Sequence, residues 1–167
     1  MIYEKSCGAV VYKLEHGRRL YLLERTPSGK TVLPKGHVEA GETEAETARR
    51  EIWEETHLVV SLDTSFREIA KYSPKPESEK TVVFFLAQPV SCDARPQPEE
   101  VDRLEWLPYE EAEAQITYPS VRKVLRKAEA VLAGRQRDCF SFDRIKPSEG
   151  KQKSARPEGR HVRIKAK

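Results

Sequence analysis

The chain has 167 residues, enough for one domain with a sizeable core, and a formal net charge of +3. No apolar run of about 18 residues is present, which excludes a transmembrane helix, and the start MIYEKSCGAVVY lacks the basic leader and apolar segment of a signal peptide. The three cysteines are widely spaced without a Cys-x-x-Cys pair, so we expect reduced thiols in a cytoplasmic protein with no membrane contact. They are Cys7, Cys92 and Cys139.

Charge is distributed unevenly along the chain. Residues 135–167 hold eleven Lys or Arg against four Asp or Glu, a net of +7, which leaves a net of −4 on residues 1–134. This pattern is typical of an acidic domain followed by a basic tail. We expect a folded domain over 1–134 and a basic, weakly ordered extension over 135–167. The extension could contact RNA or another polyanion weakly or serve only solubility, and its segment 139–145 could add a strand to the domain.

Hydrophobic patterning predicts strands that alternate with helices. Strands are expected over 3–13, 19–24, 58–62, 66–72, 80–89 and 101–107, with a short extended piece over 32–35. The run TVVFFLA within 80–89 is apolar throughout, so we expect it to be buried on both faces. Helices are expected after Thr43, from Pro108, and over 121–132, where Gly134 would end the last one. The order predicts an α/β fold with a mixed sheet covered on both faces.

The helix after Thr43 carries an unusual set of acidic side chains. Thr43 and Glu46 have the spacing of a capping box, which places the helix start at this point. Glu51, Glu54 and Glu55 stand at i, i+3 and i+4, so all three point to one side. Like charges this close repel one another, and a hard divalent cation such as Mg²⁺ would offset the repulsion.

Such glutamates could also form a solvated helix face, but the neighbouring residues favour a site. Arg50 could orient a carboxylate from behind, and a loop containing Gly36 and Gly41 leads into the helix, as a phosphate or metal site requires. An apolar stripe of three residues indicates that the helix is docked on the domain. These residues are Ala45, Ala48 and Ile52.

The stretch 36–58 resembles the Nudix box. The matching positions are Gly36, Glu42, Arg50, Glu51, Ile52, Glu54, Glu55, His57 and Leu58. His57 stands where the family has glycine, a residue suited to a left-handed helix cap. Histidine accepts positive φ at a cost of about 1 kcal/mol.

The resemblance covers roughly residues 2–133 and implies a Nudix fold, a mixed β-sheet in a three-layer α/β/α sandwich. It also implies hydrolysis of a phosphoanhydride with Mg²⁺, or Mn²⁺ in its place. The implied metal ligands are the Gly36 carbonyl and the carboxylates Glu51, Glu54 and Glu55, with Glu51 either a ligand or the general base. Arg50 and Glu42 would support them. Glu100, or its neighbour Glu99, would be the further carboxylate that the family often uses as ligand or base.

The substrate is indicated by two further segments. LPKGHVEAGET and KTVVFFLA resemble stretches of the asymmetric diadenosine tetraphosphate hydrolases. By this resemblance Lys35, His37 and Lys80 would contact polyphosphate, while Tyr72 and Tyr118 would stack on adenine. Phe84 and Phe85 replace a Tyr-Trp pair of that branch, and Val32 stands where an aromatic residue is common, so the base pocket could differ.

Three functions therefore stay open. The first is hydrolysis of dinucleoside polyphosphates, with diadenosine tetraphosphate giving ATP and AMP. The second applies the same chemistry to diphosphoinositol polyphosphates, oxidised nucleotides or the 5′ end of RNA. The third is a Nudix domain that binds nucleotide or RNA without catalysis, which the retained glutamates disfavour.

Overall fold

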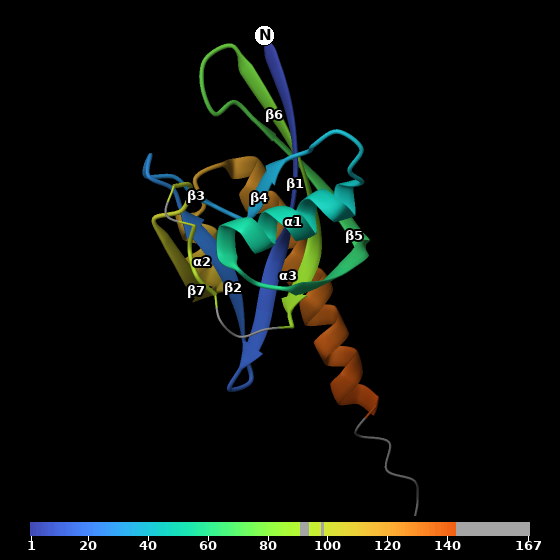
Figure 1. Cartoon of the computed structure of the whole chain (residues 1–167). Helices are drawn as coiled ribbons and strands as arrows, with labels where there is room; N and C mark the ends of the chain where they lie inside the picture. The colour runs from blue at the N-terminus through green and yellow to red at the C-terminus, as the bar shows by residue number, and fades with distance from the viewer. Residues whose placement is uncertain (91–93, 98, 143–167) are drawn as a thin grey trace, which may run out of the picture.

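The structure of the protein, a computed structural model, describes residues 1–90, 94–97 and 99–142 (Figure 1). Within them seven strands form one sheet and three helices cover it. The strands are β1 (Ile2–Glu15), β2 (Arg18–Arg25), β3 (Thr31–Val32), β4 (Lys35–His37), β5 (Val60–Tyr72), β6 (Ser78–Pro89) and β7 (Arg103–Pro108). The helices are α1 (Glu44–Thr56), α2 (Tyr109–Gln115) and α3 (Pro119–Phe142).

The sheet is mixed, as the sequence predicts. Its order is β3-β2-β1-β6-β5, with β4 paired to β1 and β7 paired to β2. β1 runs parallel to β6, with Val11 opposite Ala87, and the other pairings are antiparallel. β1 therefore connects the two halves of the sheet, and it also holds β4 beside the second half of the acidic helix α1.

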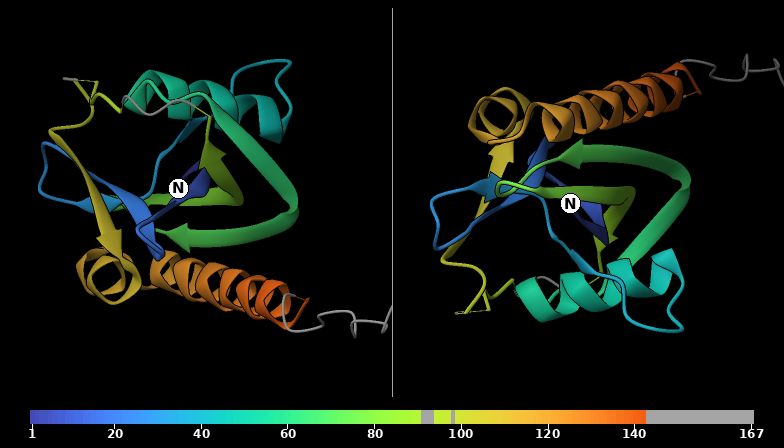
Figure 2. Two further views of the ribbon diagram at one scale, coloured as in Figure 1. Left: turned by 90° about the horizontal axis from the view of Figure 1, so that it is seen from below. Right: turned by 90° about the horizontal axis from the view of Figure 1, so that it is seen from above.

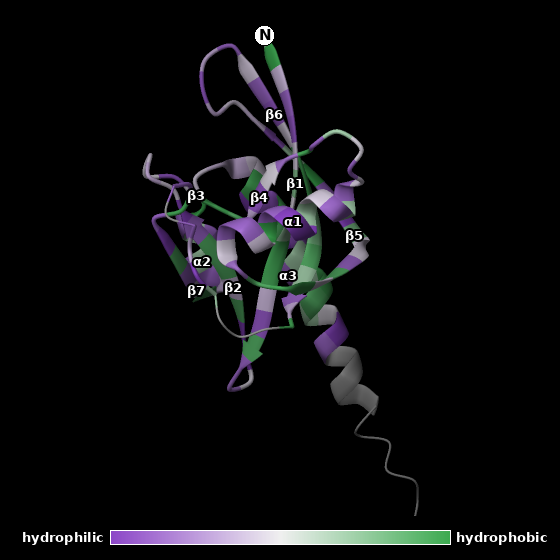
Figure 3. Ribbon diagram, viewed as in Figure 1, coloured by the Kyte–Doolittle hydropathy of each residue, from purple (hydrophilic) through white to green (hydrophobic). Residues whose placement is uncertain are grey.

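The helices make this sheet the middle of three layers. Figure 2 shows α1 on one face and α2 with α3 on the other. The apolar side chains of β6 alternate between two cores, as the period of a strand requires. Val82, Phe84 and Leu86 pack toward α2 and α3, whereas Val83, Phe85 and Ala87 pack toward α1. The central strands are correspondingly hydrophobic in Figure 3, and the expected α/β/α sandwich is confirmed.

Helix α1 begins and ends as its sequence indicates. The Glu46 backbone N–H donates to the Thr43 hydroxyl over 3.1 Å, and the Thr43 N–H donates to the Glu46 carboxylate over 3.0 Å, which completes a capping box. His57 ends the helix with φ 58°, in the left-handed region. Its ring Nδ1 lies 3.0 Å from the Arg95 carbonyl oxygen, and its ring packs edge-on against Trp53. These contacts offset the backbone cost of a non-glycine residue at this cap.

The prediction that Gly134 ends the last helix is wrong, because α3 continues to Phe142. A glycine inside a helix costs only about 1 kcal/mol, and side-chain contacts hold the helix beyond it. Arg135 donates to Asp63 over 2.8 Å, and Arg19 donates to the side-chain oxygen of Gln136 over 2.8 Å. Residues 139–142 are consequently helical, so the strand expected over 139–145 does not form there, and the first residues of the expected weakly ordered extension belong to α3.

The remaining expectations concern the strands over 58–72, the cysteines and the C-terminal residues. The strands predicted over 58–62 and 66–72 form one strand, β5, with a register shift between Asp63 and Glu68. Cys7 is a buried free thiol, whereas Cys92 and residues 143–167, with the expected polyanion contact, lie outside the described residues. Within the described part of the chain, no helix is long and apolar enough to cross a membrane.

Candidate active site

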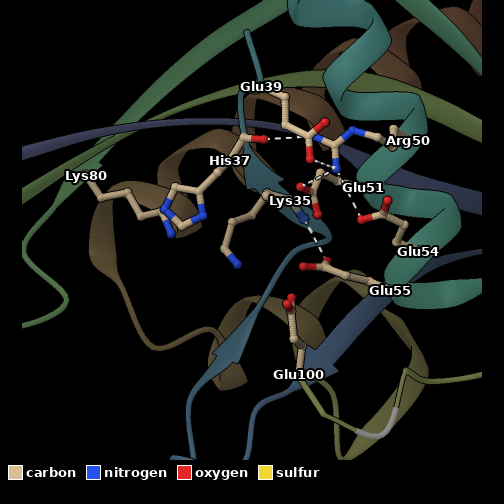
Figure 4. A pocket seen from close by; sticks show the side chains of 10 residues that line it. Lys35, His37, Glu39, Arg50, Glu51, Glu54, Glu55, Lys80 and Glu100 are labelled. Carbon is tan, nitrogen blue, oxygen red and sulfur yellow. Dashed lines mark hydrogen bonds and ion pairs between the residues drawn. The ribbon is translucent and has the colours of Figure 1, made fainter. Parts of the chain in front are cut away.

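A pocket of about 390 Å³ lies between α1, β4 and the segment that precedes β7 (Figure 4). Most of the residues singled out in the sequence line it. They are Lys35, Gly36, His37, Arg50, Glu51, Glu54, Glu55, Lys80 and Glu100, and Glu39 joins them. The two predicted tyrosines lie in a neighbouring pocket.

The three helix glutamates face this pocket from different depths. Glu55 is 2% exposed and Glu51 is 8% exposed, whereas the Glu54 side chain is 47% exposed. The Lys35 backbone N–H donates to Glu55 over 3.1 Å, which ties the helix to β4. Burial raises the pKa of both Glu51 and Glu55, although Arg50 and Lys35 respectively oppose the rise.

Arg50 connects the glycine-containing loop to the helix. Its guanidinium donates to both oxygens of Glu42, over 2.7 and 2.9 Å, and to the His37 carbonyl oxygen over 2.9 Å. It also donates to Glu51 over 2.8 Å and to Glu54 over 3.1 Å. This bidentate pairing lowers the pKa of Glu42 to about 2. The sequence expectation that Arg50 orients a carboxylate of the box agrees with this geometry.

Gly36 sits directly against the Glu51 carboxylate. A Cβ atom built on Gly36 would overlap the Glu51 carboxyl group. The absence of a side chain at Gly36 therefore gives Glu51 its place beside β4. The spacing of the two residues along the chain pointed to a common site, and the structure supplies the steric reason.

Glu24 is a site residue that the sequence reasoning missed. It lies on β2, is 1% exposed and contacts the carboxyl group of Glu55. Burial, followed by the proximity of Glu55, raises its pKa well above the ordinary value. Strand parity was the available signal, because Glu24 has the same parity as Leu22, whose side chain packs toward α1.

Two lysines separate the carboxylate pocket from the tyrosine pocket. Lys35 and Lys80 line both pockets, and the second is also lined by Lys30, Tyr72 and Tyr118. Burial lowers the pKa of Lys35, but Glu55 and Glu24 outweigh this effect and the pKa is raised. Burial and the nearby Lys35 lower the pKa of Lys80. The two pockets together form a path from acidic to aromatic side chains with positive charge between them.

The tyrosines stack on each other. The ring centroids of Tyr72 and Tyr118 are 3.9 Å apart with an interplanar angle of 18°, and the Lys30 ammonium lies 5.8 Å from the Tyr118 ring centroid. No ring fits between them in this arrangement. A base would have to stack on an outer face or separate the two rings.

The remaining predicted residues lie at the rim of the pocket. Glu100 is exposed and lines the pocket opposite α1 (Figure 4), whereas Glu99 does not line it. His37 is also exposed, and its Nε2 lies 3.7 Å from the Glu4 carboxylate. The structure therefore brings together the predicted site residues apart from Glu99, which does not line the pocket, and the tyrosine pair, which adjoins it.

The donors present fit a hard divalent cation. Among the described residues, no three His, Cys, Asp or Glu side chains are already gathered at ligating positions. However, carboxylate oxygens are the donors that Mg²⁺ prefers. The Glu51 carboxylate lies directly against Gly36 and therefore presents its oxygens beside β4. Within the described ranges, a buried oxygen of Glu24 has no hydrogen-bond partner. The lining includes five glutamates against Lys35, Arg50 and Lys80, a formal excess of two negative charges.

Comparison with known proteins agrees with this geometry. Residues 4–128 match the NUDIX domain family model. The chain is 35% identical over 133 residues to an 8-oxo-(d)GTP phosphatase of Mycolicibacterium smegmatis, covering 74% of this chain but only 40% of that protein. It is 30% identical over 135 residues to the asymmetrical bis(5′-nucleosyl)-tetraphosphatase of Caenorhabditis elegans, covering 78% of this chain and 97% of that protein.

Solved structures give the same result. The crystal structure of a C. elegans Ap4A hydrolase binary complex superposes with a TM-score of 0.73 at 30% identity, covering 78% of this chain and 98% of that chain. The protein belongs to the NUDIX domain family, whose members act on nucleotide polyphosphates and generally use divalent metals such as Mg²⁺. It is a Nudix hydrolase, an enzyme of the pyrophosphohydrolase class.

Proposed function

We propose that the enzyme hydrolyses dinucleoside polyphosphates and converts diadenosine tetraphosphate to ATP and AMP. The observation that carries this proposal is the shared wall of the two pockets, where Lys35 and Lys80 stand between the carboxylates and the tyrosines. A polyphosphate chain laid along these lysines would reach the acidic pocket at one point and bring a base to the tyrosines at another. The similarity to the C. elegans and mouse tetraphosphatases supports the same substrate class.

The charge of the pocket indicates how such an anion can bind. Five glutamates against three basic side chains repel a polyphosphate, so a bound cation has to reverse the local charge. Mg²⁺, or Mn²⁺ in its place, would be held by the Gly36 carbonyl and by Glu51, Glu54 and Glu55. Once bound, the ion neutralises phosphate charge and lowers the pKa of water.

The side chains divide the remaining work. Lys35, His37 and Lys80 bind and orient the phosphates. Glu51 has one oxygen bonded to Arg50 and a second oxygen, Oε2, outside that bond. Oε2 therefore serves either as a metal ligand or as the acceptor of the proton of the attacking water, and burial, which raises the pKa of Glu51, favours the second role. Glu100 faces Glu51 across the pocket and is the alternative base or a further metal ligand.

Arg50 is a positioning residue in this scheme. Its Nη1 donates to Glu51 and Glu54 and orients both carboxylates into the pocket. Its Nε donates to Glu42, which fixes the guanidinium from the other side. Because Arg50 also binds the His37 carbonyl oxygen, the end of β4 at His37 keeps its place relative to α1.

Hydrolysis of oxidised nucleoside triphosphates is the second candidate, favoured by the 35% identity to the M. smegmatis 8-oxo-(d)GTP phosphatase. The closed stack of Tyr72 on Tyr118 gives it a physical basis, because a substrate with one base needs only an outer face of that stack. Both candidate substrates would use the carboxylate site. They differ in the part of the substrate that extends past Lys35 and Lys80 to the tyrosines.

Product analysis distinguishes them. The full chain is incubated with Mg²⁺ and equal concentrations of diadenosine tetraphosphate, 8-oxo-dGTP and dGTP, and the products are identified by chromatography. We expect ATP and AMP in equal amounts from diadenosine tetraphosphate at the highest kcat/KM. A higher kcat/KM for 8-oxo-dGTP than for diadenosine tetraphosphate would establish the second candidate, and two ADP per molecule would contradict the asymmetric cleavage.

A further inference from the structure

Glu24 is an acidic side chain in the interior of the molecule without a cation of its own. It lies opposite Val32 of β3 and Leu104 of β7 in the sheet, and it is 1% exposed. Its Oε1 has no hydrogen-bond partner among the residues that the structure describes. Buried carboxylates are normally paired or coordinate a metal, so the position requires an explanation.

The neighbours of Glu24 make its situation more unusual. The carboxyl group within its reach is that of Glu55, which is buried itself. Lys35 lies within electrostatic reach of both groups, but in the part of the chain that the structure describes it forms no ion pair with either. Arg50 is occupied by the other glutamates of the loop and helix. The single positive charge of Lys35 thus does not neutralise both buried carboxylates when they are ionised.

We propose that Glu24 is a positioning residue of the divalent-cation site, contributed by β2 from behind Glu55. This inference rests on the metal-dependent function proposed above. Glu55 faces the pocket, whereas Glu24 does not line it. An ion held by Glu55 from the pocket side compensates the charge of both carboxylates. Glu24 thereby raises the affinity of the site for the ion and holds Glu55 against the pocket wall.

The test measures metal binding rather than turnover. Glu24→Gln keeps the shape of the side chain and removes its charge. Binding of Mn²⁺ to the full chain without substrate is measured by electron paramagnetic resonance or calorimetry. We expect the Kd of Glu24→Gln to rise by about 10- to 100-fold, the range found for residues that support a ligand from behind. The melting temperature without metal should stay equal or rise, because glutamine keeps a hydrogen-bond donor near Glu55 and has no charge to bury.

Glu129→Gln is the matched control. Glu129 is a partly buried carboxylate on α3 that accepts hydrogen bonds from Arg19 and Tyr21, on the opposite face of the sheet from α1. Its loss removes real partners, so the melting temperature should fall while the Mn²⁺ affinity stays within twofold of the wild type. Glu24→Gln is therefore expected to weaken Mn²⁺ binding without lowering the melting temperature, whereas Glu129→Gln is expected to lower the melting temperature without weakening Mn²⁺ binding.

Two results would overturn the proposal for Glu24, and a third would contradict the proposed metal site itself. An Mn²⁺ affinity of Glu24→Gln within twofold of the wild type would overturn it, and a lower melting temperature in addition would identify Glu24 as a structural partner of Lys35. If Glu24→Gln does not fold, Glu24→Asp keeps the charge but withdraws it from Glu55, and unchanged Mn²⁺ binding by Glu24→Asp would overturn the proposal equally. A wild-type chain that binds no Mn²⁺ would contradict the metal assignment itself, which no result with Glu24 variants alone can do.

Discussion

Gly36 illustrates how a single residue can fix the site without contributing a side chain. Two glycines of this region are in close contact with their neighbours, for different reasons. A Cβ atom on Gly36 would overlap the carboxyl end of Glu51, whereas one on Gly8 would overlap the Pro34 carbonyl oxygen and the Lys35 backbone. The first neighbour can move because it is the end of a side chain. The neighbours of Gly8 cannot move as easily, because the backbone of Lys35 is paired with β1 in the sheet.

Gly36→Ala should consequently affect turnover more than folding. The added methyl group displaces the Glu51 carboxylate, and a misplacement of about 1 Å at a reacting group costs about 100-fold in rate. We expect kcat for the enzyme's nucleotide substrate to fall by about that factor, with a melting temperature within a few degrees of the wild type.

Gly8→Ala is the comparison for this prediction. Its methyl group meets backbone that cannot yield, so this variant should lose stability by about 1–3 kcal/mol, in the range of overpacked cores. Chemical denaturation of both variants separates the two effects. Wild-type turnover in Gly36→Ala would show that Glu51 does not need its place beside β4.

At the scale of an element, α3 shows how tertiary contacts override a local signal. The chain before Gly134 is amphipathic, and glycine ordinarily marks a helix end. Here the helix continues because Arg135 pairs with Asp63 of β5 and Gln136 accepts from Arg19 of β2. Gly134 is left inside the helix with open space around the position of a Cβ atom.

Gly134→Ala should therefore stabilise the protein. Alanine has a higher helix propensity than glycine, by about 1 kcal/mol, and no neighbouring atom opposes the added methyl group. We expect the free energy of unfolding to rise by about 0.5–1 kcal/mol, measured by denaturant titration, with unchanged kinetics. A lower stability would mean that the helix does not pass through this position in solution.

At the scale of the whole molecule, features set by local spacing were predictable and features set by distant contacts were not. The capping box of Thr43 and Glu46, and the common side of Glu51, Glu54 and Glu55, follow from positions within a few turns of one helix. The burial of Glu24 depends on α1 and β7, which come later in the chain. It is therefore visible in the sequence only as a strand parity shared with Leu22.

The aromatic pair is a second case of the same kind. By the resemblance, Tyr72 and Tyr118 are each candidates to stack on adenine. The structure stacks them on each other because the end of β5 and the start of α3 meet at the rim of one core. Their mutual contact was not predictable from either residue alone, because it depends on how β5 and α3 pack together.

The most direct test of the account is the rate of Glu55→Gln with diadenosine tetraphosphate and Mg²⁺. Glu55 is the most buried of the three helix carboxylates, and the proposed metal site requires its negative charge to hold the ion. We expect kcat to fall by at least about 100- to 1,000-fold, the loss typical of one electrostatic group in an active site. Turnover at the wild-type rate would contradict the assignment of the helix carboxylates to a metal site.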